Sequence, residues 1–146
     1  MSSPSETRKL LYKQLILPSS PDVIHDIEAV VDEIKSTLEF KEDVYGNVMV
    51  AVTEAVNNAI IHGNKQDLDK KVFIDFEVVN QYRLVVRVKD EGPGFDPNSL
   101  PDPTSPENLI NIGGRGVFLM EQLSDELKFL DDGSISEMVF NIWWVT

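Results

Sequence analysis

Two segments near the middle of the chain, residues 72–79 and 83–89, carry apolar side chains at every second position. A period of two is typical of a strand with one buried face, so both segments are predicted to be strands. The short connection Asn80-Gln81 favours their pairing as a hairpin. The chain is therefore predicted to contain a sheet with one apolar face, which other elements must cover.

Asp90 directly follows the second predicted strand and falls in the same phase as its buried positions. A carboxylate that points at a core needs a partner, because burying a charge without one is costly. The next residues, Glu91-Gly92-Pro93-Gly94-Phe95-Asp96, contain two glycines that permit an irregular backbone open to close approach. A lone Gly-x-Gly is usually only a turn, so the carboxylate is the stronger indication of a site.

Two helices are predicted ahead of the hairpin. Apolar residues at helical spacing run from Ile24 to about Phe40, with Ser20 as the expected N-cap and Pro21 at the first helical position. A second amphipathic helix is predicted over about residues 42–62.

The second helix carries an unusual polar face. Glu54, Asn58 and His62 follow one another at intervals of four residues, which places them on one side of the helix. Gly63 is expected to end the helix as a C′ glycine. A solvated polar stripe is the commoner explanation of such a face, and this segment alone does not decide between a stripe and a site.

The segment after the hairpin is rich in proline and then in glycine. Residues 97–112 hold four of the eight prolines and have little periodicity, so they form either a disordered linker or a functional lid. Gly113-Gly114-Arg115-Gly116 then opens a helix that continues through Val117. Free N–H groups at a glycine-rich helix start can hold an anion, although a flexible joint is the plainer explanation.

The remaining elements complete an α+β pattern. Residues 9–17 predict a first strand, residues 127–130 a short strand, and residues 135–145 a last strand after the turn at Asp131-Asp132-Gly133. Residues 1–8 are expected to be a flexible leader, and residues 9–146 a single domain. Helices and strands are separated along the chain, which predicts a two-layer sandwich of one sheet with helices on one face.

Composition excludes several classes of function. The net charge of −12 argues against a nucleic-acid surface, because phosphate binding needs clustered lysine and arginine. The chain has no cysteine, which excludes disulfides and thiolate metal sites, and its two histidines, His25 and His62, offer no His/Cys cluster for zinc. It also lacks the phosphate loop of a Walker-type nucleotide site. No apolar run is long enough to span a membrane and the first residues do not resemble a secretion signal, so we expect a cytoplasmic protein. An anionic ligand would have to be held by backbone amides, a helix N-terminus or a metal ion.

Three motifs together resemble the GHKL ATPase superfamily, which includes gyrase, heat-shock chaperone, histidine kinase and mismatch-repair proteins. Glu54-Ala55-Val56-Asn57-Asn58-Ala59 resembles its N box, Asp90-Glu91-Gly92-Pro93-Gly94-Phe95 its first glycine box, and Gly113-Gly114-Arg115-Gly116-Val117 its second. The resemblance begins at about residue 9 and covers nearly all of the chain. It implies a Bergerat-type fold: a mixed sheet of about five strands covered on one face by three helices, with an ATP lid over about residues 96–112.

The resemblance implies a role for each matching residue. Asn58 would hold the Mg²⁺ that bridges the ATP phosphates, and Asp90 would accept a hydrogen bond from the adenine amino group. Glu54 would be the general base or the orienting group for the substrate hydroxyl. The remaining implied nucleotide contacts shape the base pocket, cradle the phosphates or lie near adenine, and they are Gly92, Gly94, Gly113, Gly114, Arg115, Gly116, Val117 and Ser134.

Within the superfamily, Asn58-Ala59-Ile60-Ile61-His62-Gly63-Asn64 and the small size resemble the bacterial anti-sigma factor serine kinases. This resemblance implies an ATP-dependent kinase that phosphorylates a serine or threonine of an anti-anti-sigma (STAS) protein and sequesters a sigma factor. Homodimer formation is a further expectation from the resemblance. One alternative is a non-catalytic, nucleotide-responsive binding module of the same fold. Another is a fragment of a sensor histidine kinase, which would need a phosphoacceptor helix pair that the short region before Glu54 does not supply.

Overall fold

The computed structural model describes residues 9–38, 40–80, 83–93 and 112–142, with residues 9–11 and 112–115 described as backbone. Along the chain its helices and strands are β1 (Lys9–Pro18), α1 (Ile24–Leu38), α2 (Glu42–Asn58), β2 (Lys71–Val79), β3 (Arg83–Lys89), α3 (Ile112–Leu123), β4 (Glu126–Leu130) and β5 (Ile135–Asn141). The predicted leader, Gly94 and the predicted lid up to residue 111 lie outside the described residues. So do the last residues of the predicted final strand.

The sheet has five strands in the order β1-β2-β3-β5-β4, and every neighbouring pair in it is antiparallel. The expectation of a mixed sheet is therefore wrong. The reason is that each of the two longer connections contains two elements that run out and back, α1 and α2 between β1 and β2, and α3 and β4 between β3 and β5. Pro18 at the end of β1 pairs with Lys71 at the start of β2, and Lys89 at the end of β3 pairs with Ile135 at the start of β5.

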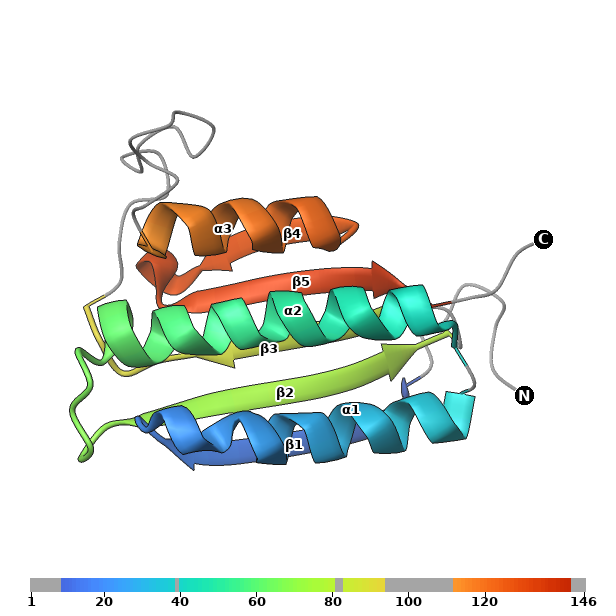
Figure 1. The fold of residues 1–146 in the computed structure, drawn as a ribbon, viewed down its shortest axis with the longest axis horizontal. Helices are drawn as coiled ribbons and strands as arrows, with labels where there is room; N and C mark the ends of the chain where they lie inside the picture. Colours follow the sequence, from blue (N-terminus) through green and yellow to red (C-terminus); the bar gives the residue numbers. More distant parts are fainter. Residues whose placement is uncertain (1–8, 39, 81–82, 94–111, 143–146) are drawn as a thin grey trace.

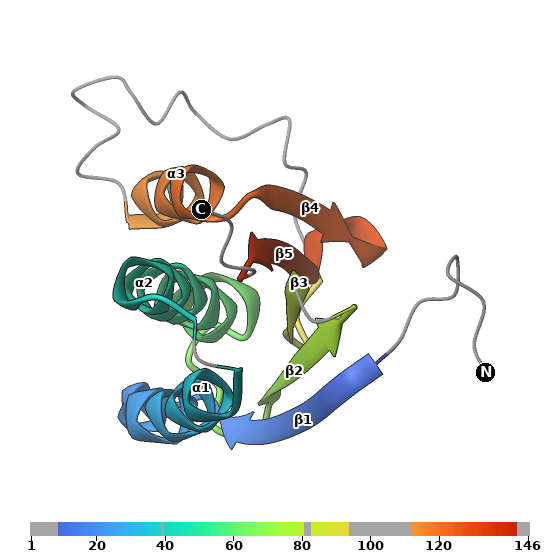
Figure 2. The ribbon, with the colours of Figure 1, turned by 90° about the vertical axis from the view of Figure 1, so that its right-hand side faces the viewer.

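The three helices cover one face of the sheet, which confirms the α+β two-layer prediction (Figures 1 and 2). The alternation seen in the sequence is the alternation of burial: Ile74, Phe76 and Leu84 are fully buried under the helices. The helices meet them with their own apolar stripes, which include the fully buried Ile27, Ile34 and Val52. Among the described helices, none is long and apolar enough to cross a membrane.

The first helix starts as predicted, with Ser20 as N-cap and Pro21 at the first helical position of a short 3₁₀ turn (Pro21–Val23) that leads into α1. The second helix ends differently. α2 stops at Asn58 and continues as a π-helical turn, η2 (Ala59–Gly63), closed by the Asn64 N–H that donates to the Ala59 carbonyl at 2.8 Å.

The π turn changes two expectations. Gly63 is not the left-handed C′ residue, since the positive φ angles fall on Lys65 (53°) and Gln66 (60°). His62 lies within this π turn rather than in α2, and its side chain is exposed.

Candidate functional site

The polar face of α2 lies against the first turns of α3, which Figure 1 shows running alongside it. The contact is close because α3 presents a glycine there. A β-carbon on Gly116 would lie 3.1 Å from both amide atoms of Asn58 and 3.2 Å from Glu54 Oε2. The structure thus brings Glu54, Asn58 and the α3 backbone together, as the sequence motifs predict.

The amide of Asn58 is only partly satisfied. Its Nδ2 donates weakly to the sulfur of Met120 at 3.7 Å, whereas its Oδ1 is buried and has no hydrogen-bond partner among the described residues. A buried acceptor without a partner costs free energy, so its retention calls for an explanation.

An unsatisfied amide oxygen fits a magnesium ion, which prefers oxygen ligands and is commonly held by one or two protein groups plus substrate phosphates. Within the described part of the chain, no cluster of three or more histidine, cysteine, aspartate or glutamate side chains could hold a metal. A cation at Asn58 would therefore take most of its coordination from a ligand and from water. That pattern suits a metal that arrives with a nucleotide.

Asp90 follows β3 and is buried, with 8% of its surface exposed. Its Oδ1 accepts a hydrogen bond from the Gly92 N–H at 2.8 Å. Burial raises the pKa of the Asp90 carboxyl, against the lowering effects of that hydrogen bond and of the Lys70 charge. Keeping the Asp90 carboxylate ionised in this buried position therefore costs free energy, and a hydrogen-bond donor on a ligand would offset that cost.

Two glycines allow the backbone to close around this carboxylate. A β-carbon on Gly63 would lie 2.2 Å from Asp90 Oδ2, and one on Gly92 would lie 2.0 Å from the Gly63 carbonyl oxygen. Real β-carbons do not approach other atoms so closely, so both positions need glycine for reasons of space. The π turn at the end of α2 and the segment after β3 thus pack directly on each other.

Ser134 reaches this cluster through its backbone. Its carbonyl accepts a hydrogen bond from the Asp90 N–H at 3.0 Å, while its hydroxyl donates to the Asp131 carbonyl at 2.9 Å. The backbone of Ser134 thus lies beside Asp90. The hydroxyl, however, is turned toward the Asp131–Gly133 turn.

The other predicted site residues lie on or before α3. Gly113, Gly114 and Arg115 are in its first turn, described as backbone, and Val117 is half-buried just beyond Gly116. Gly94 lies outside the described residues. The described candidates therefore form two groups, one at Glu54, Asn58 and Gly116 and one at Asp90 and Gly92, and α2 with its π turn contacts both.

Two further residues shape the second group. Gly63 is predicted from sequence only as a helix terminator, although a β-carbon there would collide with the Asp90 carboxylate. Asn64 has no role in the sequence predictions, yet it is fully buried and bonds to Glu91. No local pattern marks these contacts, because the partners lie far along the chain and meet only through the fold.

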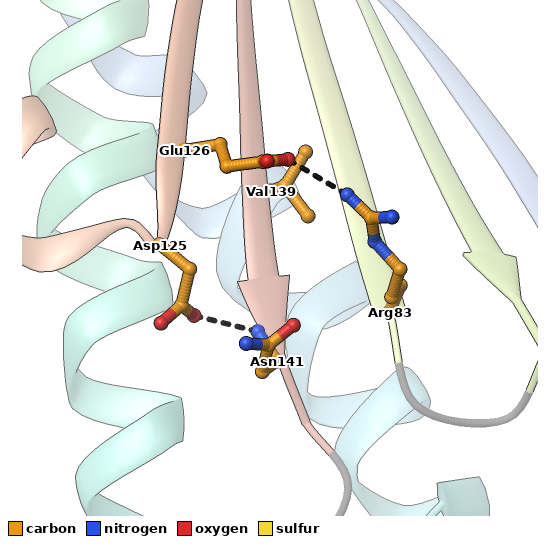
Figure 3. Close-up of a pocket in the computed structure, with 5 residues that line it drawn as sticks. All are labelled: Arg83, Asp125, Glu126, Val139 and Asn141. Carbon is orange, nitrogen blue, oxygen red and sulfur yellow. Dashed lines mark hydrogen bonds and ion pairs between the residues drawn. The ribbon is translucent and has the colours of Figure 1, made fainter.

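A pocket of about 370 Å³ lies elsewhere (Figure 3), lined by Arg83, Asp125, Glu126, Val139 and Asn141. Arg83 begins β3 and Asn141 ends β5, so the pocket is at the opposite end of these strands from Asp90. Its charged side chains are engaged with each other or with backbone, as in the Arg83–Glu126 ion pair of 2.7 Å. It is separate from the candidate site.

The chain is similar in sequence to known proteins. Residues 17–140 match the family model described as the histidine kinase-like ATPase domain. The chain is 30% identical over 131 residues to the serine-protein kinase RsbW of Bacillus subtilis, covering 86% of this chain and 81% of that one. It is 28% identical over 128 residues to the serine-protein kinase RsbW of Listeria innocua, covering 84% and 81%.

A solved structure supports the fold. The crystal structure of the RsbU and RsbW domains of Rv1364c from Mycobacterium tuberculosis superposes with a TM-score of 0.65 at 12% identity, over 90% of this chain and 32% of that longer one. At that identity the likeness shows the fold alone. The family match covers more than half of the chain, and the likeness to RsbW serine-protein kinases covers most of both proteins. The chain therefore belongs to the histidine kinase-like ATPase domain family.

Proposed function

We propose that this chain is an ATP-dependent protein kinase that phosphorylates a serine or threonine of an anti-anti-sigma (STAS) protein and sequesters a sigma factor. Family membership and the serine-protein kinase relatives support the kinase activity. The observation that carries the site assignment is the buried Oδ1 of Asn58, which has no partner among the described residues and lies one turn from Glu54.

In this proposal the nucleotide spans both groups of site residues. Asp90 would accept a hydrogen bond from the adenine amino group, with Gly92 and Ser134 near the base. Asn58 would hold a Mg²⁺ ion through Oδ1, which would supply charge neutralisation at the phosphates. The start of α3 would lie at the phosphates, where the free backbone N–H groups of its first turn favour an anion. The residues assigned to it are Gly113, Gly114 and Arg115 in the first turn, with Gly116 and Val117 directly after.

Glu54 acts on the acceptor hydroxyl. The hydroxyl oxygen forms a bond to the γ-phosphorus of ATP, the bond from that phosphorus to the β–γ bridging oxygen breaks, and ADP leaves. The hydroxyl proton passes to the Glu54 carboxylate. Phosphoryl transfer depends mainly on positioning and charge neutralisation, so a carboxylate one helical turn from the metal-binding amide suits this role.

The test is Glu54→Gln in the full chain with Mg-ATP and the cognate STAS protein. Phosphoserine or phosphothreonine formation should fall by about 10²-fold or more, because the amide cannot take the proton. ATP affinity measured by calorimetry should stay close to that of the unmodified chain. Glu28→Gln, a change of an exposed carboxylate on α1, is the matched control and should leave both quantities unchanged.

Two results would change the proposal. Unchanged phosphorylation in Glu54→Gln would remove Glu54 from the mechanism. Absence of phosphorylation by the unmodified chain, with binding of the true cognate intact, would favour the non-catalytic binding module instead.

Homodimer formation and a cytoplasmic location complete the proposal. Both rest on the resemblance to anti-sigma factor kinases and on the cellular place of sigma factors. Light scattering across a concentration series, with and without Mg-ATP, tests the dimer.

A further inference from the structure

Asn64 is the first residue after the π turn and has no exposed surface. Its side chain makes three hydrogen bonds to three different parts of the sheet. Nδ2 donates to Ser19 Oγ and to the Lys71 carbonyl, each at 2.9 Å, and Oδ1 accepts from the Glu91 N–H at 2.7 Å. One amide thus joins the end of α2 to the residues next to the ends of β1, β2 and β3.

The bond to Glu91 completes a series of three. The N–H of Asp90 donates to the Ser134 carbonyl, that of Glu91 to Asn64 Oδ1, and that of Gly92 to the Asp90 carboxylate. The Glu91 side chain is held from the same side, since its Oε1 accepts from the Lys71 N–H at 2.6 Å. The segment that aims the Asp90 carboxylate is therefore fixed at each successive residue.

Asparagine is suited to this position because it offers two donor hydrogens and an acceptor on one short, planar group. Aspartate would keep the acceptor and lose both donors, and alanine would lose all three bonds. Because the site is fully buried, a lost partner cannot be replaced readily by bulk water.

We propose that Asn64 is a positioning residue for nucleotide recognition, and that its bond to the Glu91 N–H fixes the direction in which Asp90 meets the purine. The inference rests on the proposed function, in which Asp90 accepts a hydrogen bond from the adenine amino group. Asn64 itself does not touch the nucleotide. It acts by holding residues 90–92 against Gly63 at the end of α2.

Ser19 provides a matched control. It is also buried, with 2% of its surface exposed, and its hydroxyl accepts from Asn64 and donates to the Lys70 carbonyl at 2.7 Å. Ser19→Ala removes two hydrogen bonds of the same cluster and leaves the Glu91 bond in place. A merely structural role for Asn64 predicts similar effects of Ser19→Ala and Asn64→Ala, whereas a positioning role predicts different ones.

The experiment compares binding of Mg-ATP with binding of the Mg complex of purine riboside triphosphate, which lacks the exocyclic amino group. In Asn64→Ala the preference for ATP should fall by about tenfold, because Asp90 is no longer aimed. Ser19→Ala should lower the melting temperature and keep the preference. Asn64→Asp, which retains the acceptor for Glu91, should also be less stable and keep the preference.

A second measurement needs no nucleotide. Hydrogen exchange of the Glu91 amide should be faster by about tenfold or more in Asn64→Ala and nearly unchanged in Ser19→Ala. If Asn64→Ala does not fold, Asn64→Asp decides, and loss of Glu91 protection in that folded variant would overturn the inference.

The inference is also overturned if folded Asn64→Ala keeps the ATP preference of the unmodified chain, or if Ser19→Ala loses it equally. An unmodified chain that binds both nucleotides equally well contradicts instead the purine role proposed for Asp90. The exchange measurement then still decides whether Asn64 holds the segment.

Discussion

Two glycines near the ends of the α2 segment illustrate how differently the same residue is used. Gly46 lies in the first half of α2, and, apart from its chain neighbours and the nearby backbone of its own helix, no atom of the described residues lies within 4 Å of the place where its β-carbon would stand. At Gly63, in the π turn, the β-carbon would lie 2.2 Å from Asp90 Oδ2. The first glycine costs the helix some stability, and the second leaves the space that the buried carboxylate occupies.

Because the surroundings of the two glycines differ, substitution by alanine should have different effects at the two positions. Gly63→Ala should push the Asp90 carboxylate from its place and weaken ATP binding by about tenfold. Gly46→Ala should leave ATP binding unchanged and raise the free energy of unfolding by about 0.5–1 kcal/mol, because alanine is the better helix former. Calorimetry and urea unfolding measure the two effects. ATP affinity in Gly63→Ala equal to that of the unmodified chain would show that the position of Asp90 is not what recognises the base.

At the scale of elements, Arg87 links three neighbouring strands on the face of the sheet opposite the helices. Arg87 on β3 pairs through Nη1 with Glu77 on β2 at 2.9 Å and through Nε with Glu137 on β5 at 2.7 Å. Glu77 is buried, with 6% of its surface exposed. Removal of the arginine would leave two carboxylates close together and poorly hydrated.

Arg87→Met should therefore lower the free energy of unfolding by about 2 kcal/mol. Arg83→Met, on the same strand and face, breaks the more exposed pair with Glu126 and should cost less than about 1 kcal/mol. Urea denaturation of the two variants gives the comparison. Equal losses would mean that the Arg87 network behaves like an ordinary surface ion pair.

The elements themselves were largely predictable because their periodicity is local. Alternation in residues 72–79 and 83–89 gave both central strands, and the phase of Leu84, Val86 and Val88 correctly marked Asp90 as buried. The π turn was not predictable, since a helix of 3.6 residues per turn and one with an extra residue have the same apolar pattern over so few positions. The expectation of a mixed sheet came from the family resemblance. The predicted element order, with two elements between β1 and β2 and two between β3 and β5, is itself consistent with the antiparallel sheet observed.

The close approach of candidate site residues was predicted where those residues belong to a recognisable sequence motif. It was missed where residues come together only through tertiary contacts. Glu54, Asn58 and Gly116 meet as their motifs indicate. Gly63 and Asn64 read as a helix end followed by a polar turn, yet each contacts a residue 27 positions away, Asp90 and Glu91 respectively. Sequence spacing cannot reveal such contacts before the strand order is known.

At the scale of the whole molecule, acidic residues outnumber basic ones by 25 to 13. Several of the acids lie exposed on α1, where Glu28 and Asp32 are neighbours one turn apart. Like charges at this spacing destabilise a helix, and the excess negative charge disfavours the compact state at low salt.

Glu28→Lys should raise the free energy of unfolding by about 0.5 kcal/mol at low ionic strength, because it turns a repulsive pair into an attractive one. The gain should shrink as KCl is raised to about 0.15 M, where the screening length falls to about 8 Å. Urea unfolding at both salt concentrations measures it. A gain that does not change with salt would point to helix propensity rather than to charge.

α2 contributes Asn58 from its side and, through the π turn that continues it, Gly63 from its end. One continuous helical segment therefore contacts both groups of residues in the candidate site. In the proposed complex, adenosine alone or triphosphate alone would engage only one half and would bind far less tightly than the intact nucleotide, as linked ligands do in general. Any partner protein that tilts α2 relative to the sheet would disturb the purine contacts and the phosphate contacts at the same time. Occupancy by ATP and docking of such a partner would then be thermodynamically linked, each altering the affinity for the other by the same factor.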